Sequence, residues 1–343
     1  MKNLFSYAPK ELSQDAFLCW LFNNSEEKEI EIVAKELLSK MVNLSKGYNV
    51  DPSRLTDVVA YTQVQKIDIV VDFKLDGEPC ILVIEDKTRS DEHGEQLIRY
   101  KKIVSRWNSL REEYNNRQSF FVYYKTNNIQ EEEHDRVISS EWIEFPFEQI
   151  ADFWKRYVNN NNLIVHQYAE HVVELWEDSQ TVERPKTNNL NQWTSYFNKV
   201  ICPELRQQYG EVCEIVVRET RFGYSYLKVY LKNLDFDCPY LEVRSRDCLN
   251  DEFVARLLVY DVKTDEDGFA LGFHELRNFT KDKEYLGVLK SDRSLKQNKQ
   301  IGRTPKSSKY EVTSNKDFIN FCKEAINQYI ETAKYWCEVV RCK

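Results

Sequence analysis

The 343-residue sequence has few glycines, and its nine glycines are dispersed: the closest two, Gly268 and Gly272, are four residues apart. Phosphate-cradling loops of the Walker and Rossmann kinds need several glycines within one short segment, so the sequence excludes nucleotide sites of those kinds. The five histidines show no zinc spacing, and the nine cysteines contain no Cys-x-x-Cys pair. This pattern indicates a reducing compartment and argues against a disulfide scaffold or a zinc ribbon.

Long apolar runs are also absent. The longest wholly apolar run, Ala16 to Phe22, is too short to span a bilayer or to form the core of a signal peptide. We therefore expect a cytoplasmic protein without a membrane partner. With 42% hydrophobic and 30% charged residues, the chain can bury a sizeable core, and its length favours two domains.

Acidic residues outnumber basic ones, and the formal net charge is −8. Proteins that bind nucleic acid through its phosphates usually have a basic surface, so this balance argues against a uniformly basic binding surface. The charge is uneven, however. The segment from Arg277 to Lys309 holds ten Lys or Arg against three acids, which is typical either of an arm that binds nucleic acid or of a solvated loop. A smaller basic cluster comprises Arg99, Lys101, Lys102 and Arg106.

Two runs rich in β-branched residues, Ile67–Phe73 and Cys80–Lys87, flank the dipeptide Asp76-Gly77. Both central positions of a type I′ turn need positive φ, which makes Asp-Gly a strong hairpin signal. The sequence therefore predicts a two-stranded hairpin with these two residues at its turn.

In that hairpin, counting outward from the turn sets Asp68 directly opposite Glu85, and Lys87 shares the face of Glu85 because side chains alternate along a strand. Opposed Cβ atoms lie about 4.5–5.5 Å apart. Two carboxylates at that separation form a hard oxygen site for Mg²⁺ or Mn²⁺ beside an ammonium group, which is the chemistry of metal-assisted phosphodiester cleavage. The alternative is a solvated strand edge with a weak surface salt bridge.

Two predicted helices flank the hairpin. The downstream helix, Ser90–Leu110, carries Gln96 and Tyr100 four residues apart and hence on one face. The upstream helix, Glu11–Phe22, is apolar nearly all round, which indicates burial, yet it begins with an acid and carries Asp15 one turn later. Buried carboxylates are costly unless a cation meets them, and a metal ion would suffice.

These motifs, in this order, resemble the PD-(D/E)XK nuclease superfamily, specifically its RecB-like branch. The opening segment Glu11–Trp20 is similar to the start of a prokaryotic family of that superfamily, and the resemblance extends over residues 5–150. It implies a restriction-endonuclease-like α/β fold with a mixed four- or five-stranded sheet flanked by helices. Two positions depart from the pattern: Ile67 replaces the proline before Asp68, and Asp86 occupies the x of Glu-x-Lys.

The predicted metal site consists of Asp68 and Glu85, with waters and the backbone carbonyl of Asp86 as further ligands. By resemblance, Glu11 completes the metal shell, and Asp15 is a weaker candidate. Glu11 has an alternative role as an ordinary first-turn acid that the helix dipole favours. The Asp86 side chain could support the ligands from behind or be solvated.

Lys87 is predicted to orient the attacking water or to stabilise the oxyanion, for which a compact, mobile ammonium is suited. By resemblance, Gln96 and Tyr100 position this lysine or the scissile strand. The alternative for these two residues is a helix face that packs on the sheet with a capped amide.

A polar stretch containing Pro185 predicts a boundary between a nuclease domain, residues 1–180, and a smaller α+β accessory domain, residues 190–343. The second domain shows strand-like runs followed by an amphipathic helix, Lys316–Val339, and it is expected to select the substrate or partner. Some of its residues could line one sheet face and bind nucleic acid or an anionic ligand, or simply keep that face soluble: Arg218, Arg221, Tyr224, Lys228, Arg244 and Arg246.

The sequence thus predicts a Mg²⁺-dependent phosphodiesterase that acts on nucleic acid, with DNA favoured over RNA. Two alternatives remain open. One is a nuclease fold that binds nucleic acid or protein without cleaving, and the other is a defence effector regulated by a small anionic ligand. Homodimer formation is also left open.

Overall fold

The structure is a computed structural model that describes residues 3–7, 11–45, 47–88, 95–110, 117–129, 131–187, 189–219, 225–232, 240–247, 252–259, 278–279, 287–288, 299–303 and 314–341. The chain divides into two compact units, residues 1–177 and 178–343. Within the described ranges, every helix is too short or too polar to cross a membrane.

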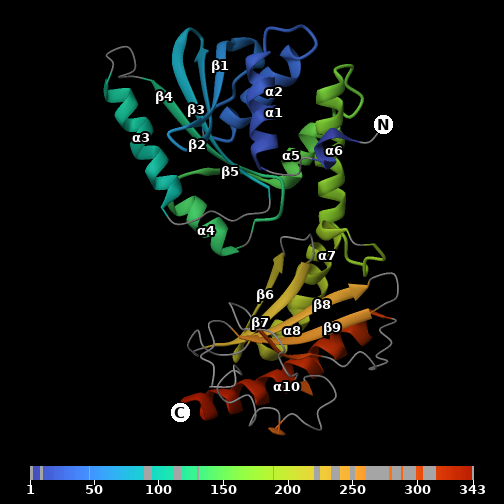
Figure 1. The fold of residues 1–343 in the computed structure, drawn as a ribbon. Helices are drawn as coiled ribbons and strands as arrows, with labels where there is room; N and C mark the ends of the chain where they lie inside the picture. The colour runs from blue at the N-terminus through green and yellow to red at the C-terminus, as the bar shows by residue number, and fades with distance from the viewer. Residues whose placement is uncertain are drawn as a thin grey trace. The chain divides into compact units, whose positions relative to one another are not determined.

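The first unit is built on a mixed five-stranded sheet with the order β1-β2-β3-β4-β5 (Figure 1). Neighbouring strands are antiparallel from β1 to β3 and parallel from β3 to β5. The restriction-endonuclease-like α/β fold with helices on both faces is thus confirmed. Its elements are η1 (Leu4–Ser6), α1 (Glu11–Asn23), α2 (Glu31–Asn43), η2 (Pro52–Arg54), β1 (Leu55–Val64), β2 (Ile67–Leu75), β3 (Glu78–Lys87), α3 (Gln96–Leu110), β4 (Gln118–Lys125), α4 (Glu131–Ser139), β5 (Ile143–Phe145), α5 (Phe147–Lys155) and α6 (Leu163–Ser179).

The predicted hairpin is present with the predicted register. Leu75 pairs with Glu78, and the pairing continues outward to Ile69 and Ile84. The two turn residues have positive φ, +53° at Asp76 and +85° at Gly77, as a type I′ turn requires. The turn therefore determines which side chains meet at the open end of the ribbon.

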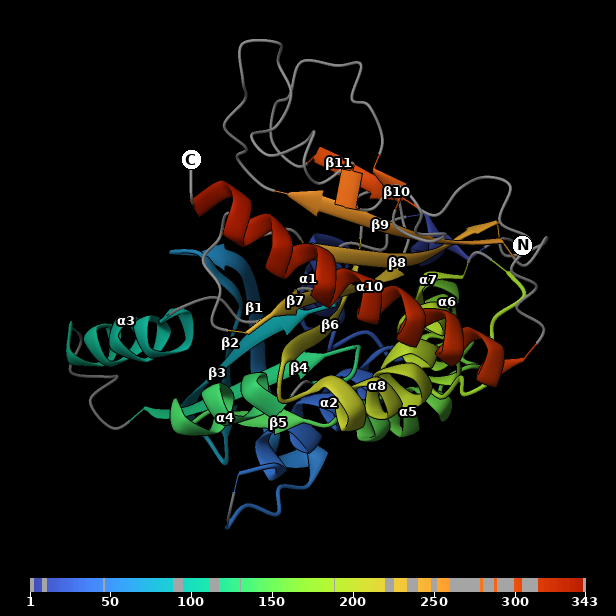
Figure 2. The same ribbon diagram turned by 90° about the horizontal axis from the view of Figure 1, so that it is seen from below.

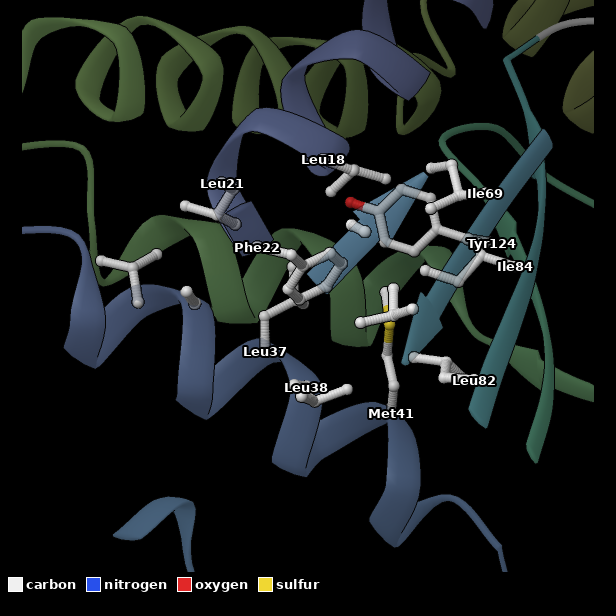
Figure 3. Close-up of a cluster of buried hydrophobic side chains, with 14 of the residues drawn as sticks. Leu18, Leu21, Phe22, Leu37, Leu38, Met41, Ile69, Leu82, Ile84 and Tyr124 are labelled. Atoms are coloured by element: carbon white, nitrogen blue, oxygen red, sulfur yellow. The ribbon is translucent and has the colours of Figure 1, made fainter. Parts of the chain in front are cut away.

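The two faces of this sheet carry separate apolar cores. On one face, α1 and α2 pack on alternate residues of β2 and β3, as Figure 3 shows for Leu18 and Met41 beside Ile69 and Ile84. The opposite face holds a smaller cluster of strand residues with Leu97, Tyr100 and Val104 of α3 and Val137 of α4. The helices on both sides leave β3 buried along most of its length.

The outer edge of the sheet is partly closed by a side chain. Asn23, at the end of α1, donates from Nδ2 to the carbonyl of Ala60 at 2.9 Å and accepts from the Ala60 N–H at 2.9 Å. These bonds occupy both backbone groups of one residue of edge strand β1, where a second strand would otherwise pair.

The second unit has an antiparallel six-stranded sheet with the order β10-β11-β9-β8-β7-β6. One sheet face packs on helices of the same unit, and α10 lies across it in Figure 2. Its elements are α7 (Leu190–Tyr196), a π-helical segment (Phe197–Ile201), α8 (Cys202–Tyr209), β6 (Cys213–Glu219), β7 (Ser225–Leu231), β8 (Tyr240–Asp247), β9 (Glu252–Val259), β10 (Gly287–Val288), β11 (Lys299–Arg303) and α10 (Asn315–Arg341).

The basic residues predicted on one face of this sheet are described only in part. Arg218 pairs with Tyr226, Lys228 with Glu242, and Arg244 with Tyr226, so these three basic residues alternate with the buried strand residues and share the opposite face. Arg221, Tyr224 and the side chain of Arg246 lie outside the described residues, as does most of the basic segment 277–309.

Replacing Gly77 by alanine should destabilise the first unit by about 1–2 kcal/mol, because a Cβ is strained at φ +85°. Nothing lies within 4 Å of such a Cβ, so the loss would report backbone strain and not a clash. Urea unfolding followed by circular dichroism measures it. An unchanged midpoint would show that the turn does not need the left-handed conformation.

Candidate functional site

Two carboxylates and one ammonium group meet at the open end of the β2–β3 ribbon. Asp68, on β2, is followed along the strand by Ile69, which pairs with Ile84, so Asp68 stands opposite Glu85. The Lys87 ammonium is in ion-pair contact with the Glu85 carboxylate and lies 3.6 Å from Asp68 Oδ2. Glu85 is fully buried and Lys87 nearly so, whereas the Asp68 side chain is 15% exposed. The predicted triplet is thus brought together, with Asp68 as its most exposed member.

Burial and mutual charge shift the protonation of this triplet. Burial, followed by the charge of Asp68, raises the pKa of Glu85 to about 8, although Lys87 opposes the shift. Burial alone would lower the pKa of Lys87, but attraction to Glu85 and Asp68 outweighs it, and the pKa of Lys87 is raised. The lysine therefore remains a cation beside two acids.

The donor set suits a small, hard cation. The Glu85 carboxylate is fully buried, with the Lys87 ammonium as its charged partner, and Asp68 Oδ2 accepts a hydrogen bond of 3.2 Å from the Asp86 N–H. Glu11 lies near enough for its negative charge to help raise the pKa of Lys87. Among the described residues, no group of three or more His, Cys, Asp or Glu converges on a metal position. The pair of opposed carboxylates, Asp68 and Glu85, fits a cation such as Mg²⁺ that takes one or two carboxylates and completes its shell with water.

Asp86 points to the opposite side of the sheet from its neighbours Glu85 and Lys87. It is fully buried, so of the two alternatives left open for this side chain, the solvated one was wrong. Its Oδ1 accepts a hydrogen bond of 2.5 Å from Gln14 Nε2, and its carboxyl group lies against that of Asp15. Burial raises the pKa of Asp86 well above its usual range and raises that of Asp15 to about 6. The pair therefore retains a proton to a higher pH than ordinary aspartates do.

Gln14 is a residue that the sequence motifs did not single out. Its buried amide donates to Asp86, while its Oε1 accepts from Thr126 Oγ1 at 3.1 Å and from Tyr168 OH at 3.0 Å. The amide thereby joins α1, the ends of β3 and β4, and α6. A glutamine amide can satisfy several partners at once, so this side chain fixes the end of β3 that carries the catalytic candidates.

Gln96 and Tyr100 lie together on α3, and their hydrogen bonds connect to the turn between β1 and β2. Gln96 Nε2 donates to Tyr100 OH at 2.7 Å, and Tyr100 OH donates to the backbone carbonyl of Lys66. Lys66 belongs to the turn between β1 and β2, where it and Gln65 have positive φ. Their hydrogen bonds thus hold this turn, although the ring of Tyr100 is close enough to Glu85 for that charge to raise its pKa after burial does.

The end of β1 that leads into this turn places another amide beside the carboxylates. Gln63 also has positive φ, +56°, and it faces Asp68 across the β1–β2 pair, since Thr62 pairs with Ile69. Its Nε2 lies 3.3 Å from Asp15 Oδ2 and 3.4 Å from Asp68 Oδ1. Gln63 therefore links the acid of α1 to the acid of β2.

A second buried lysine on the same sheet face is engaged elsewhere. Lys125 of β4 pairs with Lys87 in the parallel register, and its Nζ donates to both carboxylate oxygens of Glu133 at 2.8 and 2.7 Å. Tyr123 OH also donates to Glu133. Lys87 is therefore the ammonium that meets Asp68 and Glu85, while Lys125 ties β4 to α4.

Comparison with known protein families gives a match over half of the chain. The family model described as the PD-(D/E)XK nuclease superfamily matches residues 2–175, a range that contains every site residue discussed above. No curated protein and no solved structure shows significant similarity to the chain. The match is to the superfamily, so assignment to the RecB-like branch stays a prediction.

Replacing Gln14 by leucine should lower the stability of the first unit by about 1–3 kcal/mol, because Asp86, Thr126 and Tyr168 lose a buried partner. The free energy of unfolding in urea measures the loss. Gln149→Leu, at an exposed position of α5, is the matched control and should change stability by less than about 0.5 kcal/mol. Equal effects of the two substitutions would contradict the role of Gln14.

Replacing Tyr100 by phenylalanine removes the hydroxyl group that holds the Lys66 carbonyl. We expect a loss of about 1 kcal/mol and faster amide hydrogen exchange in the β1–β2 turn, measured by mass spectrometry. Tyr61→Phe, on the exposed part of β1, is the control. Unaltered exchange in the turn would show that Tyr100 does not hold it.

Proposed function

The chain belongs to the PD-(D/E)XK nuclease superfamily, and from that premise we propose that it hydrolyses phosphodiester bonds of nucleic acid with the help of a divalent metal ion. The observation that carries the proposal is the buried carboxylate of Glu85 opposite Asp68, with the ammonium of Lys87 in contact with Glu85 and 3.6 Å from Asp68 Oδ2. Buried carboxylates are costly unless cations meet them, and here two acids stand beside a single ammonium group, so a metal ion would offset the remaining negative charge.

Asp68 and Glu85 would hold the metal ion, with Glu11 at the margin of the site and the backbone carbonyl of Asp86 as a further oxygen donor. When bound, the ion lowers the pKa of a coordinated water and neutralises charge that develops on the phosphoryl group. Gln63 keeps the Asp68 carboxylate oriented, because its amide contacts Oδ1 while the Asp86 N–H contacts Oδ2. Such supporting contacts fix the direction of a ligand before it binds the ion.

Lys87 would act on the reacting groups themselves. Its ammonium remains charged and reaches both carboxylates, so it can hold the attacking water or meet the oxyanion without changing its protonation. A donor that is fixed before the reaction costs no reorganisation in the transition state. Gln96 and Tyr100 would contribute by holding the β1–β2 turn in place.

Mg²⁺ or Mn²⁺ as the ion and DNA as the substrate are the finer parts of the proposal. The hard oxygen donors favour these ions, and DNA is carried over from the sequence interpretation. The second unit would select the substrate or partner. The competing hypothesis is a nuclease fold that binds without cleaving, which the presence of all three groups, Asp68, Glu85 and Lys87, disfavours.

Incubation with linear, circular and single-stranded DNA and with RNA, in Mg²⁺, Mn²⁺ or EDTA, tests the proposal. The wild type should cut only with metal, and Lys87→Ala should lose at least about 100-fold in rate. Calorimetry should show that Lys87→Ala still binds Mg²⁺, because both carboxylates remain, whereas Asp68→Ala should bind neither metal nor substrate productively. Asp135→Ala, at an exposed position of α4, is the control.

Two results would count against the proposal. Metal-independent cutting would exclude the mechanism, and equal Mg²⁺ affinity of the wild type and Asp68→Ala would exclude the ligand assignment. Nucleic-acid binding without cutting under any of the metal conditions would favour the competing hypothesis.

A further inference from the structure

Helix α3 carries positive charge in a place where helix stability does not explain it. Its fifteen residues include four Lys or Arg and no acid, although acids outnumber bases in the whole chain. Arg99 stands in the first turn, where the helix dipole disfavours cations, and the last turn has no basic residue to benefit from the dipole. A helix that merely needed a solvated face would gain from mixed charges at i,i+4 spacing.

Three of the four basic residues form one exposed stripe. Arg99, Lys102 and Arg106 are separated by three and four residues, so they lie on one side of the helix, and all three are exposed. The opposite side of α3 packs on the sheet through its apolar residues. Among the described residues, no carboxylate forms an ion pair with any of the three.

The fourth basic residue differs from its neighbour. The Lys101 ammonium is bound to the carboxylate of Glu141 and lies 3.4 Å from the backbone carbonyl of Ser140. It is only partly exposed, whereas Lys102 is exposed. One helix therefore offers two adjacent lysines, one used within the fold and one directed to solvent.

The stripe begins at the site. The Arg99 guanidinium lies 5.2 Å from the centre of the Tyr100 ring, and Tyr100 in turn holds the carbonyl of Lys66, an exposed lysine in the β1–β2 turn. Tyr100 also lies close enough to Glu85 for the charge of that carboxylate to raise the pKa of the Tyr100 hydroxyl, after burial does. Tyr100 thus connects the exposed lysine of the β1–β2 turn with the first residue of the basic stripe on α3.

We propose that the strip formed by Lys66, Arg99, Lys102 and Arg106 binds the sugar–phosphate backbone of a nucleic-acid strand and leads it to the carboxylate pair. This inference rests on the proposed function, because it assigns the surface that holds that substrate. The spacing fits: Arg99 and Arg106 are about 10 Å apart along the helix axis at 1.5 Å per residue. Successive phosphates of one strand advance about 3.4 Å along the duplex axis, so a strip of that length that runs parallel to the axis extends over about three of them.

Contacts to phosphates give a measurable signature, because each one releases counterions. The logarithm of the binding constant should fall linearly with the logarithm of the salt concentration. Each phosphate contact contributes about 0.9 to the magnitude of this slope on a duplex and about 0.7 on a single strand. Such contacts do not read bases, so their loss should weaken binding to the same degree for different sequences.

The test compares Lys102→Gln with Lys101→Gln, which remove the same charge from adjacent positions of one helix. The double variant Lys102→Gln, Arg106→Gln extends the series. Binding of a fluorescein-labelled DNA duplex and of its single strand is measured by anisotropy over a range of salt concentrations in EDTA, so that cleavage does not interfere. Circular dichroism and urea midpoints check that each variant is folded.

We expect Lys102→Gln to reduce the salt slope by about 0.9 on duplex, and the double variant by about twice that, while Lys101→Gln leaves the slope unchanged. Equal slopes for the wild type and the double variant would overturn the inference. Equal losses for Lys101→Gln and Lys102→Gln would also overturn it, because the effect would then follow net charge and not the stripe.

The outcome is separable from that of the proposed function. If the stripe variants alter the slope but the wild type cuts nothing with any metal ion, the surface assignment holds and the hydrolytic proposal fails. If the wild type cuts with metal while the double variant binds as the wild type does, the hydrolytic proposal holds and the stripe is not the binding surface.

Discussion

The site depends on one constraint: two acids on neighbouring strands must remain opposite each other although they repel. Asp68 and Glu85 stand across an antiparallel pair whose register is fixed by a two-residue turn at the far end. The ammonium of Lys87 offsets part of the repulsion, and the burial of Glu85 makes the remaining cost large. The other polar contacts of the first unit keep this unfavourable arrangement from relaxing.

Those contacts approach the carboxylates from both sides of the sheet. From the α1 side, Gln14 holds Asp86 and thereby the strand end between the two catalytic candidates. From the α3 side, Tyr100 holds the β1–β2 turn, which in turn positions Gln63 against Asp68. Apolar side chains pack behind each of these contacts and keep them rigid. The unfavourable free energy of holding two acids together is thus offset by the burial of apolar side chains elsewhere in the unit.

The parts of this arrangement that follow from local rules could be predicted from the sequence. A two-residue Asp-Gly turn determines the register of the residues beside it, and strand alternation then places Asp68, Glu85 and Lys87 together. The contacts of Gln14 could not be predicted, because its partners are 72, 112 and 154 residues away. The sequence also could not decide between the buried and the solvated alternative for Asp86, because the choice depends on where α1 packs. Spacing alone put Tyr100 near the site but did not reveal that it binds a backbone carbonyl.

The buried pair of Lys125 and Glu133 has a consequence for how this fold can change over time. Both side chains are almost fully inaccessible, and Glu133 also accepts from Tyr123. Breaking such a pair from one side leaves an uncompensated charge and costs about 3–5 kcal/mol, whereas replacing both partners with apolar residues of similar volume is often neutral. Sequences that diverge from this chain should therefore keep both residues or replace both, so that the two positions change together and not independently.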